Sequence, residues 1–339
     1  MVFFQVVIGG VTRLTESGLS ITKWDVVSGT FPPLSDAAWQ KEFDLYKQTP
    51  QYREINEGMS FSDFKFIYFW EYVHRLWARF MGFVFLVPFI WFVANKKLSN
   101  TILKHLGIVV LLAILAATFG WIMVASGLIE RPWVNAYKLS LHLLIAFAVY
   151  LALLWTYLRA RFERPVLNLS SLKINSIFGI FIGIVFVQLF LGGVLSGMRA
   201  AVVYPTWPDM YGSYFPSVIF DMNQWNADNF NNYDKNAFMP ALIHFLHRNT
   251  AYILMIAGYW ISYRMIRFGK VAEYINFKNI GYTLIGVITL QALLGIITVM
   301  SSKHEIPVLW GVLHQGGALL LISVVLYIYF VISKSKEIV

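Results

Sequence analysis

Two stretches of this sequence decide its fold: EYVHRLWARF, residues 71–80, and HFLHRNTAYI, residues 244–253. Each carries a His-Arg pair, His74–Arg75 in the first and His247–Arg248 in the second, inside a long apolar run. A charged residue near the centre of a membrane helix costs roughly 2.5–3.5 kcal/mol on insertion scales, so its presence there indicates a functional site. The recurrence of the pair in the same setting also indicates an internal repeat.

The composition is typical of an integral membrane protein. Of the 339 residues, 58% are hydrophobic and only 13% are charged, which is far from the composition of soluble domains. A membrane-spanning helix needs about 20 mostly apolar residues, and an eighth apolar segment, residues 1–11, is too short to span by itself. The predicted full-length spans are residues 66–94, 106–126, 139–158, 174–198, 240–263, 280–301 and 307–332.

The positive charge is arranged by loop rather than gathered in a patch. The net charge is +9, but one set of alternate loops holds 13 basic residues against three acids, and the other set holds 11 against 14. The positive-inside rule places the first set in the cytoplasm or matrix, so the long loops 12–65 and 199–239 face outward. This pattern argues against a nucleic-acid partner. The absence of cysteine excludes disulfides and thiolate ligands, and we recognise no cleavable signal peptide.

The internal repeat extends well beyond the His-Arg pair. His142 follows His74 by 68 residues, and His314 follows His247 by 67. The segment GWIMVASG precedes His142 as GIITVMSS precedes His314, and GGVTRLTESG and GGVLSGMRAA open the two copies. We therefore predict an all-α bundle of eight helices built as two tandem four-helix repeats. The halves are residues 1–160 and 161–339, and the first helix is expected to be truncated.

Four of the seven histidines, His74, His142, His247 and His314, lie on the second or fourth helix of their repeat. They lie at similar depths near the outer face. Zinc usually takes four ligands, whereas two imidazoles on opposite helices suit the axial positions of a haem iron. A single membrane histidine is more often an interhelical hydrogen-bonding group, but four with matched spacing predict two haem sites in which they are the metal ligands.

Glu71 is the only carboxylate placed within a predicted span, while the repeat has His244 at the corresponding position. Arg75, Arg79 and Arg248 are the remaining charges within spans. The simpler interpretation is an intrahelical Glu71–Arg75 pair at i, i+4, which leaves His74 unexplained. The asymmetry favours catalysis in the first half and a structural or electron-transferring haem in the second.

Two other protein classes compete with a haem-modifying enzyme. A di-haem cytochrome b electron carrier commonly stacks two histidines on one helix, whereas here each helix offers one ligand. A transporter could use Glu71 and its arginines as a proton or substrate site. The parallel repeat and the matched histidines favour the enzyme, and a Soret band would separate it from the transporter.

At these residues the chain resembles the haem A synthase family, in its cysteine-free proteobacterial and mitochondrial form. The segment GGVTRLTESGLSITKWDVVSGTFPPL (9–34) is similar to the first outer loop of that family, and EYVHRLWAR matches its Glu-x-x-His-Arg motif. GWIMVASGL (120–128) and YPTWPDM (204–210) are also similar. The resemblance covers residues 5–325, nearly the whole chain.

The resemblance implies an activity and a role for each site residue. The family oxidises the C8 methyl of haem O to a formyl group, giving haem A for cytochrome c oxidase. His74 and His142 would face the substrate haem, and His247 and His314 would ligate a resident haem b. Glu71 would be the catalytic acid beside the reacting methyl. The arginines could bind haem propionates, since Arg suits bidentate carboxylate contacts; pairing with Glu71 or with helix-end carbonyls is the alternative.

The resemblance also implies partners and a location. Expected partners are haem O, the enzyme that supplies it, an unidentified electron-transfer partner and membrane lipid, and a homo-oligomer stays open. The expected location is a bacterial inner (plasma) membrane, with the sites near its outer face. Two positions depart from the family pattern: Tyr204-Pro205 stands where Tyr-Asn is usual, and His244 stands where Gln is more frequent.

Overall fold

The computed structural model describes the chain except for residues 24–29, 130, 163–174, 273–274 and 334–339. Part of the outer-loop motif therefore lies outside the described residues, as do the start of the span predicted at 174–198 and several charges used to assign the topology. These charges are Glu163, Arg164, Lys173, Glu273, Lys334, Lys336 and Glu337. The chain divides into two compact units, Met1–Val149 and Tyr150–Val339.

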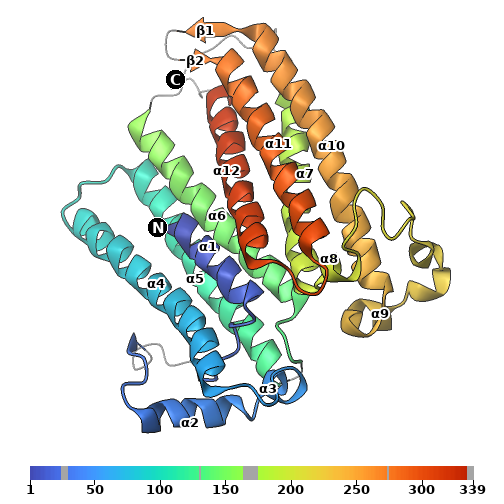
Figure 1. The fold of residues 1–339 in the computed structure, drawn as a ribbon. Coiled ribbons are helices and arrows are strands. Elements are labelled where there is room, and N and C mark those ends of the chain that lie inside the picture. Colours follow the sequence, from blue (N-terminus) through green and yellow to red (C-terminus); the bar gives the residue numbers. More distant parts are fainter. Residues whose placement is uncertain (24–29, 130, 163–174, 273–274, 334–339) are drawn as a thin grey trace. The chain divides into compact units, whose positions relative to one another are not determined.

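The structure is almost entirely helical (Figure 1), which confirms the predicted fold class. The long helices are α4 (Phe61–Ala94), α5 (Asn100–Ile129), α6 (Ala136–Arg161), α7 (Asn175–Gly197), α10 (Phe238–Phe268), α11 (Phe277–Ser301) and α12 (Val308–Ile332). The shorter helices are α1 (Val2–Leu14), α2 (Asp36–Tyr46), α3 (Pro50–Glu54), α8 (Ala200–Val203) and α9 (Ala227–Asn231), with 3₁₀ turns η2 (Ser217–Phe220), η3 (Met222–Gln224) and η4 (Tyr233–Lys235). Strands β1 (Lys270–Ala272) and β2 (Ile275–Asn276) form a small antiparallel pair between α10 and α11.

Within the described residues, six helices are long and apolar enough to cross a membrane: α4, α5, α6, α7, α11 and α12. Inside a bilayer every backbone N–H and C=O must be satisfied within the segment, which is why these apolar runs form continuous helices. Large apolar side chains are exposed on them, Phe83 being 70% exposed, as expected for a surface that faces lipid. Helix α10 has 31 residues but a more polar sequence, so the count of eight spanning helices stays a prediction.

The first unit begins with α1 packed against α4. The segment after α1 then returns toward the helices, where Leu19 is 2% exposed. A Cβ on Gly127 of α5 would lie 2.8 Å from the Leu19 side chain, so glycine is what allows this approach. Residues 15–23 are thereby held against α5 as well as against α4, and this placement decides the surroundings of Glu71.

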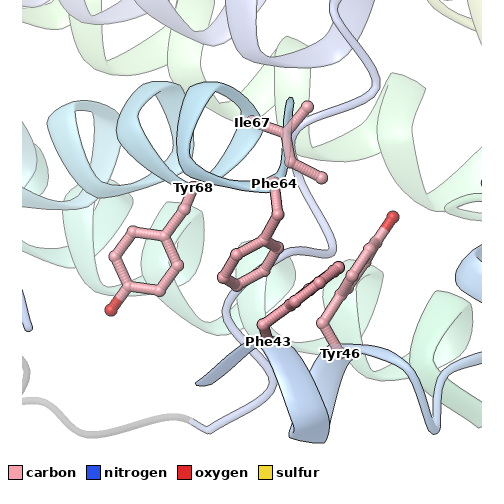
Figure 2. Close-up of a cluster of buried hydrophobic side chains, with 5 residues drawn as sticks. All are labelled: Phe43, Tyr46, Phe64, Ile67 and Tyr68. Atoms are coloured by element: carbon pink, nitrogen blue, oxygen red, sulfur yellow. The ribbon is translucent and has the colours of Figure 1, made fainter. Parts of the chain in front are cut away.

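An aromatic cluster joins α2 to the start of α4. Phe43 and Tyr46 of α2 pack against Phe64, Ile67 and Tyr68 of α4, and Figure 2 shows the five side chains facing one another. The rings of Phe43 and Phe64 stack with centroids 4.8 Å apart. The cluster gives the segment between α1 and α4 an apolar core of its own and fixes it over the first turns of α4.

Helices α2, α3 and α4 begin where the sequence supplies a capping side chain. Ser35, Thr49 and Ser60 are their N-cap residues, and each accepts a hydrogen bond from a backbone N–H of the first turn. Pro50 follows Thr49 at the start of α3, where proline is favoured because that N–H has no helical partner. Local sequence thus explains why α2, α3 and α4 begin where they do.

The second unit is a closed group of four long helices. Helix α10 packs against α7 and α11, α11 packs against α12, and α12 packs against α7 (Figure 1). Glycine again permits close helix contacts: a Cβ on Gly281 of α11 would lie 2.8 Å from the Ser262 carbonyl oxygen of α10. Residues 200–237, between α7 and α10, form α8, α9 and the 3₁₀ turns, and α8 packs against α10 and α7.

Candidate functional site

Glu71 is a buried carboxylate in the first third of α4, with 2% of its surface exposed. Its Oε2 accepts hydrogen bonds from the Ser20 hydroxyl, at 2.7 Å, and from the Ile21 backbone N–H, at 2.8 Å. Its Oε1 lies 2.5 Å from Nη2 of Arg75, four residues along the helix. A buried charge must be paired and hydrogen-bonded, and these three donors meet that need while fastening the segment after α1 to α4.

Arg75 holds the same segment through its donors. Its Nη2 donates to the Ile21 carbonyl at 3.1 Å, and its Nη1 donates to the Lys23 carbonyl at 3.2 Å. The intrahelical Glu71–Arg75 pair that the sequence allows is therefore present, and it also fastens a loop. Arg79, one turn further along α4, is partly buried, so the in-span charges of α4 lie along one stretch of the helix.

His74 and His142 each lie against a glycine of the helix that precedes theirs in the repeat. A Cβ on Gly9 of α1 would lie 3.1 Å from His74 Nε2, and a Cβ on Gly120 of α5 would lie 3.0 Å from His142 Cε1. The Nδ1 of His142 lies 3.0 Å from the Ala116 carbonyl oxygen. A carbonyl only accepts, so Nδ1 carries the hydrogen and Nε2 keeps its lone pair.

The second unit repeats this arrangement with His247 and His314. A Cβ on Gly192 of α7 would lie 3.1 Å from His247 Cε1, and a Cβ on Gly295 of α11 would lie 2.9 Å from His314 Cε1. All four predicted histidines therefore lie against glycines at equivalent places of the repeat.

Two glutamines contact the imidazoles of the second unit. Gln188 Nε2 of α7 lies 3.3 Å from His247 Nε2. Gln291 Nε2 of α11 lies 3.2 Å from His314 Nδ1 and donates to the His314 carbonyl at 3.0 Å. Each ring thus meets a glycine on one side and a carboxamide at one of its nitrogens.

Arg248 and His244 connect α10 to the loop that follows α7. The guanidinium of Arg248 donates to the Thr206 carbonyl at 3.1 Å and to the Pro208 carbonyl, and its Nη2 lies 3.3 Å from His244 Nε2. His244 and Arg248 are 2% and 6% exposed. The pair lies on α10 with the spacing that Glu71 and Arg75 have on α4, and it too holds the loop that follows the first helix of its unit.

The histidine pairs fit the axial ligation of a haem better than a metal site made of side chains alone. Within the described ranges, the structure contains no group of three or more His, Asp, Glu or Cys side chains that could hold a metal ion. A haem needs only two axial side chains, because the macrocycle supplies the other ligands. The Nδ1 of His247 is buried and, among the described residues, has no hydrogen-bond partner, and an orphaned ring nitrogen of this kind is suited to a metal.

The glycines and glutamines that contact the histidines are the part of the site that the sequence analysis missed. Their signal is nevertheless present as a repeated Gln-x-x-x-Gly pattern: QVVIG at 5–9, QLFLG at 188–192 and QALLG at 291–295. The fourth copy is AATFG at 116–120, with Ala in place of Gln. Residues four apart lie on one face of a helix, so this pattern could have predicted a glycine and an amide aimed at one partner.

Comparison of the sequence with known proteins identifies the family of this chain. The family described as "Cytochrome oxidase assembly protein" (COX15-CtaA) matches residues 1–326. A "Heme A synthase" from Bradyrhizobium sp. (strain BTAi1) is 37% identical over 325 residues, which cover 95% of this chain and 86% of that protein. A "Heme A synthase" from Rickettsia africae is 35% identical over 338 residues (99% and 96%), and one from Flavobacterium psychrophilum is 36% identical over 338 residues (98% and 95%). This chain therefore belongs to the COX15-CtaA family of cytochrome oxidase assembly proteins, as its outer-loop and Glu-x-x-His-Arg motifs predict.

Proposed function

We propose that this protein oxidises the C8 methyl of haem O to the formyl group of haem A by two successive hydroxylations, after which the hydrated aldehyde loses water. Family membership and the haem A synthase relatives make it an oxidoreductase of haem A biosynthesis for cytochrome oxidase. The six apolar helices make it an integral membrane protein. The assignment of chemistry to particular residues is the proposal.

In the first unit, His74 and His142 bind the substrate haem and Glu71 handles the proton at the reacting methyl. The observation that carries this assignment is the buried position of Glu71, three residues before His74 on α4 and held by Ser20, Ile21 and Arg75. Residues three apart lie on one face of a helix. A carboxylate fixed in this way keeps one position relative to a bound haem, and a positioned acid or base contributes about 10²–10⁴-fold to a proton transfer.

In the second unit, His247 and His314 hold a resident haem b. When bound, such a haem supplies one-electron transfer between the reaction site and an external redox partner. The glycines against the two rings support this assignment, because they leave each imidazole in a slot that a side chain would fill. His244 replaces the carboxylate in this unit, so no acid of the Glu71 type is present at the equivalent position.

Arg75, Arg79 and Arg248 are the proposed partners of the haem propionates, since guanidinium groups suit carboxylates. Arg75 and Arg248 also hold loop carbonyls. Contact with a propionate would therefore join the bound haem to the outer loop of its unit. We further propose a bacterial inner membrane location with both sites near the outer face, haem O delivered by its own synthesising enzyme, and a separate electron-transfer partner.

The test is to express the chain with a haem O supply and to analyse extracted haems by chromatography and mass spectrometry. Wild-type protein is expected to give haem A, and Glu71→Gln is expected to give bound haem b without haem A. Glu54→Gln, an exposed position on α3, is the matched control and should behave as wild type. Bound haem b with neither haem A nor a hydroxylated intermediate in the wild-type protein would instead favour an electron carrier.

A further inference from the structure

The segment between α8 and α9 exposes large apolar side chains although it belongs to no long helix. Phe215 is 56% exposed, Phe220 is 63% exposed and Met222 is 78% exposed. A soluble surface seldom presents several such side chains close together, and a patch of this kind marks a surface that a protein partner or a membrane covers. The contacts of this segment with α10 indicate which of the two it is.

Aromatic contacts fix the segment to the first third of α10. The ring centroid of Phe215 lies 5.6 Å from that of Phe245 on α10 and 6.3 Å from that of Phe220. The Tyr214 hydroxyl donates to Asn249 Oδ1 of α10 at 2.8 Å, and the 3₁₀ turn η2, which ends at Phe220, packs against α10. The exposed rings therefore lie beside residues 245–249.

Helix α10 continues from this point as an exposed apolar stripe. Its exposed large hydrophobic side chains are Leu246, Ile253, Ile256, Trp260 and Tyr263. An apolar groove that Ile177 of α7 also lines lies on the same surface. Helix α7 is long and apolar enough to cross a membrane, and α10 packs against it. The stripe on α10 therefore faces the same lipid as α7.

The length of the stripe locates its two ends in the bilayer. Leu246 and Tyr263 lie about 26 Å apart along the helix at 1.5 Å per residue, which is close to the hydrocarbon thickness of roughly 30 Å. Trp260 and Tyr263 are residue types that gather at membrane interfaces, and Arg264 lies over the Trp260 ring at 5.6 Å. The other end of the stripe, with the segment packed on it, then lies at the opposite interface.

The charge of the connection between α7 and α10 indicates how it would contact lipid. Residues 200–237 contain four aspartates and one lysine. Anionic lipid headgroups attract basic segments, so electrostatic attachment is unfavourable here. Insertion of apolar and aromatic side chains, which is the other source of interfacial binding, is what this composition supports.

We propose that residues 214–222 are an interfacial membrane anchor, in which Phe215, Phe220 and Met222 insert among the lipid headgroups beside α10. The anchor goes beyond the proposed function, since it involves neither haem nor the reaction. It follows directly on the loop whose carbonyls Arg248 holds. That loop would therefore be fixed to α10 on one side and to the membrane on the other.

The absence of cysteine makes the depth of this segment measurable with a single spin label. The full-length protein, reconstituted in phosphatidylcholine vesicles, carries a nitroxide at Phe220→Cys, at Ile256→Cys as the lipid reference, or at the exposed Ala227→Cys of α9 as the aqueous reference. Power-saturation measurements compare collisions with oxygen, which concentrates in lipid, and with a water-soluble nickel chelate. The label at 220 should collide with nickel several-fold less than the label at 227 and with oxygen nearly as often as the label at 256.

Three results would overturn the anchor. A label at 220 that is as open to nickel as the label at 227 would place the segment in water. A label that is immobile and shielded from both reagents would show that protein covers it, either a partner or a second copy of this chain. A label that enters lipid only when phosphatidylglycerol is added would show that charge, and not apolar insertion, holds the segment.

A variant pair tests the contact with α10. Phe215→Ala removes the ring that joins Phe220 to the helix, so the label at 220 should become several-fold more open to nickel. Phe230→Ala, in the same connection but with its ring against Trp225, is the matched control and should leave the label unchanged. The label at Ile256 reports whether α10 itself is undisturbed. Equal nickel collision in the two variants would overturn the placement of the anchor on α10.

Discussion

Position 71 in the first unit and position 244 in the second occupy equivalent places, three residues before a histidine and four before an arginine. Both side chains contact that arginine, and both arginines hold the carbonyls of the loop after the first helix of their unit. An arginine can therefore hold the loop with histidine at this position. Holding the loop alone does not explain why the first unit has a carboxylate there, which is why we assign proton transfer to Glu71.

The histidine pairs differ in a second respect. In the second unit a glutamine side chain reaches each imidazole, and the four long helices close on one another. In the first unit the Gln5 amide donates to the backbone carbonyl of His74, the ring of His142 contacts the Ala116 carbonyl, and both rings lie against glycines. On the proposed function, one structural plan would serve a haem that is retained in the second unit and a haem that is exchanged in the first.

The largest expected effect comes from removing the carboxylate that only the first unit carries at this position. Glu71→Gln should lower haem A formation at least 10²-fold, because an amide of the same shape cannot take up or release the proton, while haem b stays bound. The measurement is haem A per mole of protein after expression with a haem O supply. Haem A formation within a few-fold of wild type would show that the carboxylate only fastens the loop, and haem b content reports whether the variant has folded.

A smaller effect is expected at the glycines that contact the rings. Gly295→Ala would place a Cβ 2.9 Å from His314 Cε1, so the ring must shift and haem b occupancy should fall. Gly286→Ala on the same helix meets open space and should stabilise α11 by about 0.5–1 kcal/mol, since alanine favours helix over glycine. The ratio of the Soret to the protein absorbance checks both, and equal ratios in the two variants would argue against a close ring contact.

The smallest effect concerns α2 and α3 of the first unit. Burial raises the pKa of Tyr46 from 10.0 to about 12, and its hydroxyl bonds Gln51 and Asn56. The folded state thus keeps the phenol proton more tightly than the unfolded chain, so stability is independent of this group below pH 10 and falls between pH 10 and 12.

Hydrogen exchange in α2 and α3 as a function of pH checks this expectation. Tyr46→Phe should lose the alkaline dependence of protection and about 1 kcal/mol of stability at neutral pH, because Gln51 and Asn56 lose their partner. An alkaline loss of protection that persists unchanged in Tyr46→Phe would assign the titration to another group.

Much of this architecture could be predicted from the sequence, because a helix that crosses lipid needs a long continuous run of apolar residues. The sequence predicts as spans the runs that form α4, α5, α6, α7, α11 and α12, and local motifs predict the family. Helix α10 is a different case: its His-Arg motif marks the site, and the same polar residues lower its resemblance to an apolar span.

Other features depend on contacts between segments that are distant in sequence. Ser20 and Ile21 reach Glu71 across about 50 residues, and nothing local to either segment indicates the pairing. The contacts of Gln291 with His314 required knowledge of which helix faces which. Helices α2 and α3 are the opposite case. Their starts are indicated by local sequence, in the capping residues Ser35 and Thr49 and in Pro50, which follows Thr49.

The most direct test of the division between the two units is the haem b content of protein purified from cells that make no haem O. His314→Ala should lose the bound haem b, and His142→Ala should retain it at the wild-type level, because the proposal assigns the resident haem to the second unit. Retention in His314→Ala with loss in His142→Ala, or equal losses in both, would contradict the assignment of cofactor and substrate to separate units.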